Sequence, residues 1–374
     1  MNFDLTPEQA AIQETFRRYA RERLKPRAAA IDEAGVFPRE AFREIGRLGF
    51  FGMRYPEAAG GVGADVVAYC LVAEELAYGS CSVAAACSMQ SLMGTYFLHR
   101  FATEEQKERL FLPALAGEKV GTICITEPNA GTDLKSIAST ARRERGGFVL
   151  SGQKIWITQA PVADFFTVFA KLDDVLNIFL VERSDAGLIV GRDIKKMGVW
   201  ASVTSEVAFE ECWIPGDRLL GEEGRGASYL REILDEIRVM TGALAVGVGR
   251  AALEDSLEYA QQRVQFGRPI AAFQAIKLKF AEMATDLEAA RRLVLYAAWR
   301  SDQGRPNTKE AAMAKLFASE AALTVCEKAA RVLASYGYAM EYPIQRYLRD
   351  IRFTLIGGGT SEILKLIIAK ETGA

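Results

Sequence analysis

The sequence predicts an α-helical region, a β region and a helical bundle, in that order along the chain. The hydrophobic pattern changes from helical to strand-like and back, and the last part holds long helical stretches broken at Gly-Arg-Pro sequences. A chain of 374 residues exceeds the size at which one hydrophobic core usually stops growing. We therefore expect an N-terminal α-helical domain (1–118), a middle β domain (119–227) and a C-terminal helical bundle (228–374).

The first region carries the signals of helix starts. Thr6 is placed to cap a helix, Pro7 suits its first position and Gln9 completes a capping box. Thr103 and Gln106 form the same pattern before a later helix. Together with apolar residues at helical spacing, these signals predict helices through this region.

The segment 79–98 has no formally charged residue, which raises the question of a membrane span. Its polar residues make it too polar for hydrocarbon; they are Ser80, Ser82, Ser88, Gln90, Ser91 and Thr95. We expect a buried helix of small residues instead. The first ten residues are also polar, and they do not resemble a signal peptide.

The middle and last regions differ in the length of their elements. Short stretches rich in β-branched and aromatic residues predict strands at 148–158, 165–172, 176–182 and 205–214. Long amphipathic stretches predict helices at 227–264, 273–303 and 308–335, followed by two shorter ones. Helices of this length with short connections indicate an antiparallel bundle.

Composition excludes several classes of protein. Lys plus Arg (46) nearly balances Asp plus Glu (48), so the net charge of −2 gives no sign of nucleic-acid or anionic-membrane binding. The six cysteines (70, 81, 87, 124, 212, 326) form no CxxC pair, which fits a reducing cytoplasm. The one histidine, His99, leaves little from which to build a metal site or a Ser-His triad, and we expect it at a solvated helix end.

Three features each allow a structural and a functional interpretation. The glycines at 357–359 before Thr360 and Ser361 suit either a flexible turn with a helix cap or a close backbone approach to a ligand. Trp156 in a strand is more often a core residue than a cofactor contact. Arg268 at a helix break is either a surface residue or a phosphate ligand.

Five motifs decide between these interpretations. The stretches "CITEPNAGTDLKS" (124–136) and "QRVQFGRPIAAFQAIKLKFAEM" (262–283) resemble the two signatures of the acyl-CoA dehydrogenase family. "WIT" (156–158), "YGYAMEYPIQRYLRD" (336–350) and "GGGTSEI" (357–363) follow the family's order and spacing. The resemblance covers the whole chain. It implies an N-terminal α-helical domain, a middle β-barrel, a C-terminal four-helix bundle, one FAD per subunit and a homotetramer.

The resemblance also assigns roles to individual residues. It implies that the 126–132 loop donates hydrogen bonds to the flavin, that the Trp156 ring packs on it and that the Thr158 hydroxyl bonds its N5. Arg268 is expected to reach the pyrophosphate of an FAD held by a neighbouring subunit. The implied cofactor-binding residues are Thr126, Gly131, Thr132, Trp156, Thr158, Arg268, Gln274, Thr360 and Glu362, and the implied substrate-binding residues are Thr132, Arg238 and Gly358.

The family's catalytic carboxylate is missing from both of its usual positions. Family members remove the α-proton of an acyl thioester with a Glu while a hydride leaves to flavin N5. Most carry this Glu two residues before the Thr that matches Thr360, where this chain has Gly358. A second group carries it just before an Arg that matches Arg238, where this chain has Ile237.

Three explanations are open at this stage. Glu236 is a relocated base, although one residue turns a helix by about 100° and a solvated surface Glu is the competing interpretation. Alternatively the scaffold performs different chemistry, such as oxygenation or oxidation of an unusually acidic substrate. The third explanation is a silent FAD-binding partner subunit. Trp200, which stands where many relatives have Arg, and the open space at Gly358 also predict a reshaped substrate channel.

The sequence therefore predicts an FAD-dependent oxidoreductase that dehydrogenates an acyl thioester carried by CoA or a carrier protein. Glu236 is the predicted catalytic residue, and no metal is expected. The predicted electron acceptor is an electron-transfer flavoprotein. The alternatives are a flavin monooxygenase or oxidase and the silent subunit.

Overall fold

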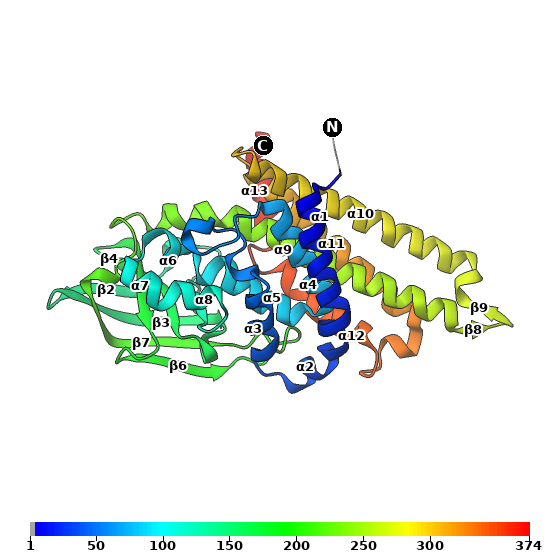
Figure 1. The fold of residues 1–374 in the computed structure, drawn as a ribbon, viewed down its shortest axis with the longest axis horizontal. Coiled ribbons are helices and arrows are strands. Elements are labelled where there is room, and N and C mark those ends of the chain that lie inside the picture. The colour runs from blue at the N-terminus through cyan, green and yellow to red at the C-terminus, as the bar shows by residue number, and fades with distance from the viewer. Residues whose placement is uncertain (1–3) are drawn as a thin grey trace.

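The computed structural model describes residues 4–374 and places a curled β-sheet at one end of the molecule and long helices at the other (Figure 1). Residues 1–3 of the polar leading stretch lie outside this description. The N-terminal helices are α1 (Pro7–Tyr19), α2 (Ala28–Ala34), α3 (Arg39–Arg47), α4 (Val66–Gly79), α5 (Cys81–Ser88), α6 (Tyr96–Phe101), α7 (Glu104–Gln106) and α8 (Leu112–Leu115). The predicted helical first region is confirmed.

Both predicted capping boxes form. The Thr6 hydroxyl accepts a hydrogen bond from the Gln9 backbone N–H at 3.1 Å, and the Gln9 side chain accepts one from the Thr6 N–H at 3.0 Å. Thr103 and Gln106 make the same reciprocal pair at 3.1 and 3.2 Å. Each box pairs two N–H groups that a helix start leaves without partners, and this is why the helices begin where the sequence places them.

The middle region is a single curled sheet. Its strands are β1 (Gly121–Cys124), β2 (Thr140–Glu144), β3 (Gly147–Thr158), β4 (Phe165–Leu172), β5 (Val175–Glu182), β6 (Leu188–Asp193) and β7 (Thr204–Pro215). The strand order is β1-β4-β2-β3-β7-β6, and β5 pairs with β4. The path ends at β1 and β6, so the predicted barrel takes the form of an open half-barrel.

The four predicted strands correspond to β3, β4, β5 and β7, but the sequence did not reveal three others. Strand β1 has only four residues. Strand β2 reads TARRE and exposes its arginines, while β6 reads LIVGRD with a glycine and two charges. Such edge and polar segments lack the apolar alternation that marks a half-buried strand, so only pairing with neighbours identifies them.

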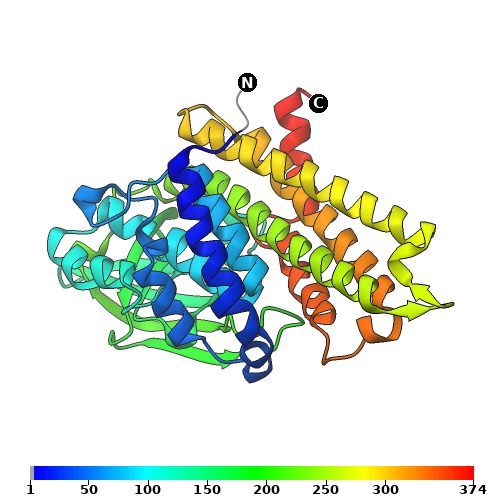
Figure 2. The same ribbon diagram turned by 45° about the vertical axis from the view of Figure 1, so that its right-hand side comes forward.

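The last region contains the predicted long helices. They are α9 (Gly226–Gln262), α10 (Gln274–Asp302) and α11 (Thr308–Leu333), followed by α12 (Pro343–Ile351) and α13 (Ser361–Thr372). Figure 2 shows α9, α10 and α11 side by side, with a small hairpin of β8 (Val264–Gln265) and β9 (Arg268–Pro269) at the far end. The predicted boundaries lie within two residues of those observed.

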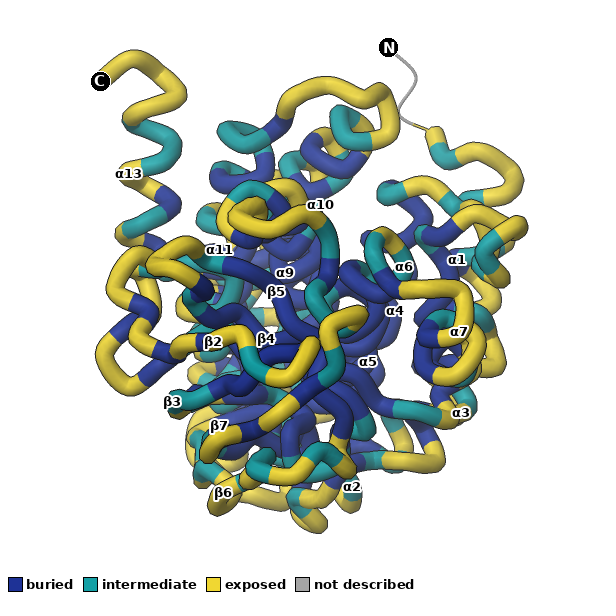
Figure 3. Tube along the Cα trace, turned by 90° about the vertical axis from the view of Figure 1, so that its left-hand side faces the viewer, coloured by how far each residue is buried: buried dark blue, intermediate teal, exposed yellow. Residues whose placement is uncertain are grey.

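Buried residues form two apolar cores. One lies inside the half-barrel and includes Phe148, Phe166 and Val207. The other is shared by the N-terminal and C-terminal helices. Figure 3 shows this distribution: α4, α5 and α9 are buried along most of their length, whereas α13 stands out with much of its surface exposed.

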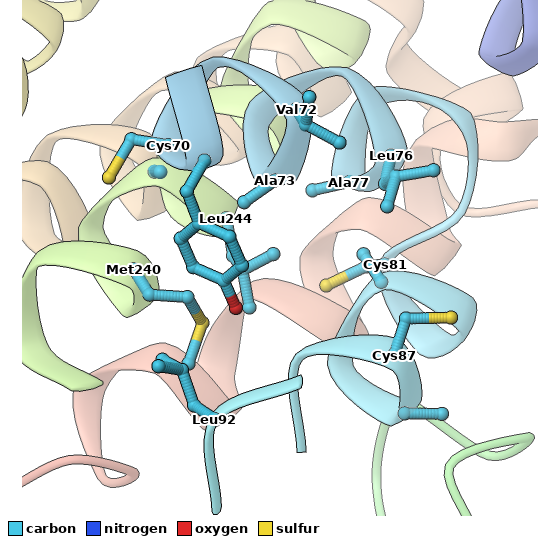
Figure 4. Close-up of a cluster of buried hydrophobic side chains, with 14 of the residues drawn as sticks. Cys70, Val72, Ala73, Leu76, Ala77, Cys81, Cys87, Leu92, Met240 and Leu244 are labelled. Atoms are coloured by element: carbon cyan, nitrogen blue, oxygen red, sulfur yellow. The ribbon is translucent and has the colours of Figure 1, made fainter. Parts of the chain in front are cut away.

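Helix α4 and helix α9 pack at very short range. A side chain at Gly247 would place its Cβ 2.2 Å from the Glu74 carbonyl oxygen, so only glycine permits this approach. Beside it, Cys70 and Leu76 of α4 contact the cluster that holds Met240 of α9 (Figure 4). The small residues of these helices therefore serve packing.

The uncharged segment 79–98 is helical and buried, as predicted. It consists of α5, a π-helical turn (Met89–Gly94) and the start of α6. No helix within residues 4–374 is long and apolar enough to cross a membrane. His99 lies near the end of α6 but is only half-exposed, because its ring packs on Tyr55 with centroids 4.6 Å apart.

A buried charge network joins the N-terminal and C-terminal helices. Glu74 and Glu75 of α4 are 2% and 0% exposed. Arg250 of α9 forms ion pairs with both, at 3.2 Å in the case of Glu75. Arg291 of α10 also bonds Glu74 at 2.9 Å. Two adjacent buried carboxylates are tolerated because these arginines neutralise them.

Replacing Arg250 should destabilise the protein strongly. Arg250→Ala leaves two buried carboxylates with less compensation, and we expect the free energy of unfolding to fall by about 3–5 kcal/mol. Urea unfolding of the two proteins measures the difference. The control is Arg292→Ala, which removes an exposed pair with Glu288 and should change stability by about 0.5 kcal/mol or less. Equal small losses in both variants would contradict the role of the network.

Candidate active site

The loop that follows β1 is held by a buried ion pair. Lys154 is fully buried, and its ammonium donates to Glu127 at 2.7 Å and to the Phe169 carbonyl at 2.7 Å. Glu127 also accepts from the backbone N–H groups of Ala138 and Ser139 at 2.6 and 3.0 Å. Burial alone would raise the pKa of Glu127, but these hydrogen bonds hold it below its usual value. Glu127 therefore ties the start of the loop from 126 to 139 to its end and to β3.

This loop lies directly beside β3. The Thr126 carbonyl accepts a hydrogen bond from the Ile155 N–H at 2.9 Å. Gly131 is exposed, and a Cβ there would meet only the Thr126 methyl group at 3.9 Å. Thr132 is exposed beside it. Asp133 accepts from the Lys135 N–H at 3.1 Å and caps the short turn that follows, while Gly131 and Thr132 stay exposed.

Trp156 is turned outward by a β-bulge. The pairing of β3 with β7 shifts between Lys154 and Ile157, and Trp156 adopts a φ of 62° that non-glycine residues seldom take. Its side chain is 55% exposed. The core interpretation of this tryptophan is therefore wrong, and a flat aromatic surface is available to a ligand next to Thr126.

Thr158 ends the same strand and is half-buried. Its carbonyl accepts from the Thr122 hydroxyl of β1 at 2.6 Å, which ties the two strands together. The next residue, Gln159, is fully buried and donates its backbone N–H to Val203 at 2.6 Å. The structure thus brings together three predicted cofactor residues, Thr126, Trp156 and Thr158, on one edge of the half-barrel.

The three glycines form a loop, here called the glycine loop (residues 357–359), that lies on α9. Gly358 and Gly359 have φ values of +72° and +106°. A Cβ at Gly358 would lie 3.5 Å from the Ile237 methyl Cγ2 and 3.3 Å from the Thr241 hydroxyl. The two positions that carry the base in other members of the resembling family are therefore neighbours in space, and here one is bare and the other apolar.

Thr360 caps the last helix, as one interpretation of the sequence required. Its hydroxyl accepts from the Ile363 N–H at 3.4 Å, and α13 follows at once. Glu362, in the first turn, is exposed. The positive end of the helix dipole lies at this terminus, which suits an anionic part of a ligand.

Glu236 is paired rather than free. Its carboxylate forms an ion pair with Arg54, and both side chains are largely buried, at 24% and 14% exposure. Arg54 comes from the segment before α4, and its Nε has no hydrogen-bond partner among residues 4–374. Ile237, not Glu236, faces the glycine loop. The base assignment to Glu236 stays a prediction.

Arg238 is buried beside the same turn of α9. It is 8% exposed, and its guanidinium bonds Asp235 at 2.6 Å. Asp235 also accepts from the Thr308 hydroxyl at 2.6 Å. Arg238 is therefore held by α9 and α11 within one turn of Ile237 and Thr241, the residues that face Gly358.

Arg268 and Gln274 are not brought to the other cofactor residues. Both are exposed, and the Arg268 guanidinium lies 4.4 Å from the centre of the Phe273 ring. They belong to the β8–β9 hairpin and the start of α10, at the opposite end of the molecule from the half-barrel that carries Trp156 (Figure 1). Within one chain they cannot join Trp156 on a common ligand.

Trp200 lies in a segment anchored to both helical regions. The Arg349 guanidinium lies 4.0 Å from the centre of its ring, and Arg349 also pairs with Asp32 of α2. Asp350 of α12 accepts the Val199 N–H at 2.6 Å. Burial raises the pKa of Asp350 to about 7, against its neighbouring arginines. The Trp200 segment is thus anchored to α12, and through Arg349 to α2.

Sequence reasoning missed three functional candidates: Arg54, Lys154 and Lys315. The side chains of Lys154 and Lys315 are fully buried. For Lys154 and Lys315 the only signal in the sequence is a lysine inside an apolar strand or helix pattern, which is weak evidence of function while its partner is unknown. Each has its partner elsewhere in the sequence: Arg54 pairs with Glu236, Lys154 with Glu127, and Lys315 with the Gly359 carbonyl.

The residues present fit FAD. The exposed Trp156 ring offers a surface for a flat ring system, the 126–132 loop offers hydroxyl and backbone donors with no Cβ at Gly131, and the α13 terminus suits negative charge. No cluster of metal ligands is present within residues 4–374. Fold and site together define a flavin-dependent oxidoreductase of acyl thioesters.

Comparisons with known proteins agree. Models described as the N-terminal, middle and C-terminal domains of acyl-CoA dehydrogenase match residues 6–118, 122–212 and 224–373. The sequence is 62% identical to benzylmalonyl-CoA dehydrogenase of Aromatoleum aromaticum over 377 positions, covering 100% of both chains. The chain belongs to the acyl-CoA dehydrogenase family.

Solved structures extend the comparison. Butyryl-CoA dehydrogenase of Megasphaera elsdenii superposes with a TM-score of 0.96 at 36% identity, covering 100% of both chains. PigA with FAD and proline superposes with a TM-score of 0.95 at 30% identity, covering 100% of this chain and 99% of PigA. The chain is an FAD-dependent acyl-CoA dehydrogenase flavoenzyme, and the monooxygenase and silent-subunit alternatives are not favoured.

Asp350 should give the protein a measurable pH dependence of stability. Its folded pKa of about 7 exceeds the unfolded value of about 3.9, so the folded state binds the proton more tightly between these values. Its contribution to the free energy of unfolding is therefore greatest at low pH and falls as pH rises from about 4 to 7.

Asp350→Asn removes this titration and keeps an oxygen for the Val199 N–H. As pH rises from about 4 to 7, the free energy of unfolding of the wild type should fall by up to about 4 kcal/mol relative to that of the variant. Thermal unfolding of both proteins at pH 4.5 to 8 gives the difference, in which other titrating groups cancel. A difference that does not change with pH would contradict the burial of this carboxyl group.

Proposed function

We propose that this enzyme oxidises a 2-carboxyacyl thioester, a substituted malonyl-CoA, with loss of its carboxylate as CO2. One observation carries the proposal: the two positions that supply a base in the family are Gly358 and Ile237, which lie against each other and offer no carboxylate. The relative from Aromatoleum aromaticum is named for benzylmalonyl-CoA. A malonyl thioester carries a carboxylate on the carbon from which other members remove a proton.

Loss of CO2 makes a base unnecessary. When the bond between C2 and the carboxylate breaks, its electron pair becomes available at C2 and forms the C2–C3 double bond as a hydride leaves C3. FAD, when bound, supplies the acceptor for that hydride. The products are CO2 and an α,β-unsaturated acyl thioester, so no proton is taken from C2 and the electrons balance.

The surroundings of the glycine loop suit this reaction. Ile237 is 6% exposed and apolar, and Gly358 adds no side chain, so neither position offers a polar group to the substrate's carboxylate. A carboxylate in an apolar site is poorly solvated and gains by losing its charge. Hydrogen-bond donors on the thioester carbonyl would stabilise the negative charge that develops as CO2 leaves.

In a family member that carries the catalytic Glu, the Glu side chain would fill the space beside positions 358 and 237. A Glu side chain from position 358 or 237 occupies the volume that the substrate's own carboxylate takes in this proposal. The substrate then brings the carboxyl group that the enzyme lacks. A benzyl group is the proposed substituent on C2, which places a phenyl ring on C3, and CoA is the proposed carrier, following the name of the relative.

Glu236 as a relocated base is the competing mechanism. It lies one residue before Ile237, but its carboxylate is paired with Arg54 and would have to leave that partner to reach C2. The remaining proposed roles follow the family: Thr126, Gly131, Thr132, Trp156, Thr158, Thr360 and Glu362 toward FAD, and Thr132, Arg238 and Gly358 toward the substrate. Arg268 and Gln274 are proposed to contact the FAD of a second subunit.

An electron-transfer flavoprotein is the proposed electron acceptor, and a cytoplasmic homotetramer is the proposed assembly. All six cysteines are free and buried, which supports a reducing compartment. The exposed β8–β9 hairpin, with Phe266 at 93% exposure, supports contact with another subunit. Turnover with the flavoprotein but not with O2 alone supports this acceptor, and the reverse result assigns the electrons to O2.

The first test compares two substrates that differ by one carboxylate. Under anaerobic conditions benzylmalonyl-CoA should bleach the bound flavin with release of one CO2, because the C2–carboxylate bond supplies the electron pair. The matched thioester without the carboxylate, 3-phenylpropanoyl-CoA, should leave the flavin oxidised. Stopped-flow absorbance and trapped CO2 measure the outcome. Equal bleaching by both compounds would show that a protein base exists.

Glu236→Gln separates the two mechanisms. If CO2 loss replaces the base, the variant should still oxidise benzylmalonyl-CoA at a rate near that of the wild type and keep its FAD. If Glu236 is the base, kcat should fall by about 10²–10⁴-fold. Steady-state kinetics decides, with Glu232→Gln as a control on a more exposed carboxylate of the same helix, paired with Arg100.

A base can be restored at Ile237. Position 237 is helical, whereas Gly358 has a φ of +72° that would strain any side chain, so Ile237→Glu is the better way to add a carboxylate against the glycine loop. The variant should gain activity on 3-phenylpropanoyl-CoA of about 10²–10⁴-fold over the wild type. Ile237→Gln, of equal size but not basic, should gain none. Gain in both variants, or in neither, argues against this location for C2.

Arg268 should control cofactor retention. The purified protein should be yellow, and Arg268→Ala should weaken FAD binding by about 1.5–3 kcal/mol through loss of a charge-assisted contact to the pyrophosphate. The ratio of flavin to protein absorbance after gel filtration measures retention. Arg305→Ala is the control, since Arg305 also lies over an aromatic ring, at 5.4 Å from that of Trp299.

Two results would overturn this set of assignments. A colourless native protein that cannot be reconstituted with FAD contradicts the flavoenzyme itself. A monomer that keeps FAD at low protein concentration, seen by sedimentation, contradicts the contact of Arg268 with a second subunit.

A further inference from the structure

Lys315 is a buried lysine that directs its charge at the glycine loop. It lies on α11, is 0% exposed, and its Nζ donates to the Gly359 carbonyl at 2.6 Å. No carboxylate within residues 4–374 forms an ion pair with it. Lysine is almost never fully buried without a paired charge, so this placement needs an explanation.

Helix α11 holds the whole segment around the glycine loop. Ser319, one turn after Lys315, donates to the Thr354 carbonyl at 3.0 Å. Glu320 accepts from the Ser361 hydroxyl at 2.7 Å. These two contacts fix the ends of the segment, and Lys315 holds its middle, where the glycines have no side chains to anchor them.

The opposite side of the glycine loop rests on α9. The Cβ position of Gly358 lies at contact distance from Ile237 and Thr241. Thr241 is itself bonded to the Ile237 carbonyl at 2.7 Å. The distance between the loop and the side chain of Ile237 is therefore set by α9 on one side and by the Lys315 ammonium on the other.

We propose that Lys315 is a positioning residue of the reaction: its ammonium holds the glycine loop against α9 so that Gly358 and Ile237 together form one wall beside C2 of the thioester and its carboxylate. This inference rests on the proposed function, because it is that function which places C2 at Gly358. Lys315 acts through the loop and does not itself touch the substrate.

The charge of Lys315 is adjustable near physiological pH. Burial lowers its pKa to about 8; the nearby charge of Arg238 lowers it too, whereas Glu320 and Glu362 raise it. Asp235 partly neutralises Arg238. A charge-assisted hydrogen bond is about twice as strong as a neutral one, so the hold on Gly359 weakens when the proton is lost above pH 8.

Stability alone does not account for this lysine. Because its folded pKa lies below the unfolded value of about 10.4, its burial destabilises the fold at every pH at which it is charged, and this effect fades as pH rises from about 8 to 10. A well-packed apolar side chain at this position would not lower the free energy of unfolding in this way. A role in holding the loop explains why a cation is placed there.

Two substitutions separate the hydrogen bond from the charge. Lys315→Met keeps the length of the side chain but removes the donor, whereas Lys315→Gln keeps a donor that does not titrate. Ser319→Ala is the control, since it releases a neighbouring anchor without touching any charge. All three are compared as FAD-loaded proteins on benzylmalonyl-CoA.

We expect Lys315→Met to lower kcat by about 10–100-fold with little change in KM, as a misplaced reacting centre does. Lys315→Gln should keep most of the activity but lose the decline of kcat above pH 8 that the wild type shows. Ser319→Ala should keep that decline. Wild-type kcat in Lys315→Met, or the same alkaline decline in Lys315→Gln, would overturn the proposal.

Hydrogen exchange tests the hold on the loop without any turnover. The amides of residues 357–360 should exchange at least about 10-fold faster in Lys315→Met, because the loop opens more often. Unchanged exchange there overturns the proposal even if activity falls. If the wild type oxidises no thioester while the exchange result holds, the proposed function fails and the anchoring by Lys315 stands.

Discussion

The close packing of α9 against its neighbours is the constraint on which the rest of the structure depends. At Gly247 the helix approaches α4 so closely that any Cβ would overlap the Glu74 carbonyl. Fixing α9 there fixes the turn that carries Ile237, ten residues earlier, on the face that meets Gly358. The buried carboxylates on α4 and their arginines on α9 and α10 hold the same interface electrostatically. The packing of α9 against α4 therefore also sets the geometry of the site at Ile237 and Gly358.

The helical part of the fold could be predicted because its signals are local. The Thr6 and Thr103 capping boxes and the Gly-Arg-Pro breaks mark ends that the structure reproduces. Strands β1, β2 and β6 could not be predicted, since a short or charged strand is recognised only through its pairing with other strands. The open form of the half-barrel could not be predicted either, because no pattern in the sequence indicates that the sheet ends at β6 instead of closing into a barrel. The domain boundaries at 118 and 227 remain predictions.

The candidate site was predictable in identity more than in geometry. The motifs indicated Thr126, Trp156 and Thr158. The exposure of Trp156, however, depends on a β-bulge and a positive φ that could not be predicted from the sequence. The absence of a base was visible in Gly358 and Ile237. Their contact was not, and neither was the pairing of Glu236 with Arg54, because side-chain partners far apart in sequence leave no local trace.

A single chain carries the cofactor contacts at two opposite ends. If Trp156 and Arg268 touch one FAD, as proposed, they belong to different subunits, because α9 and α10 separate them within each chain. Cofactor retention and assembly would then be linked: whatever binds the assembled form stabilises it. The exposed Phe266 and Tyr338, at 93% and 92%, lie in this far region and suit burial in such a contact. Such an assembly would also give an ionic partner to the Arg268 guanidinium, which forms no ion pair within residues 4–374 and lies over the Phe273 ring.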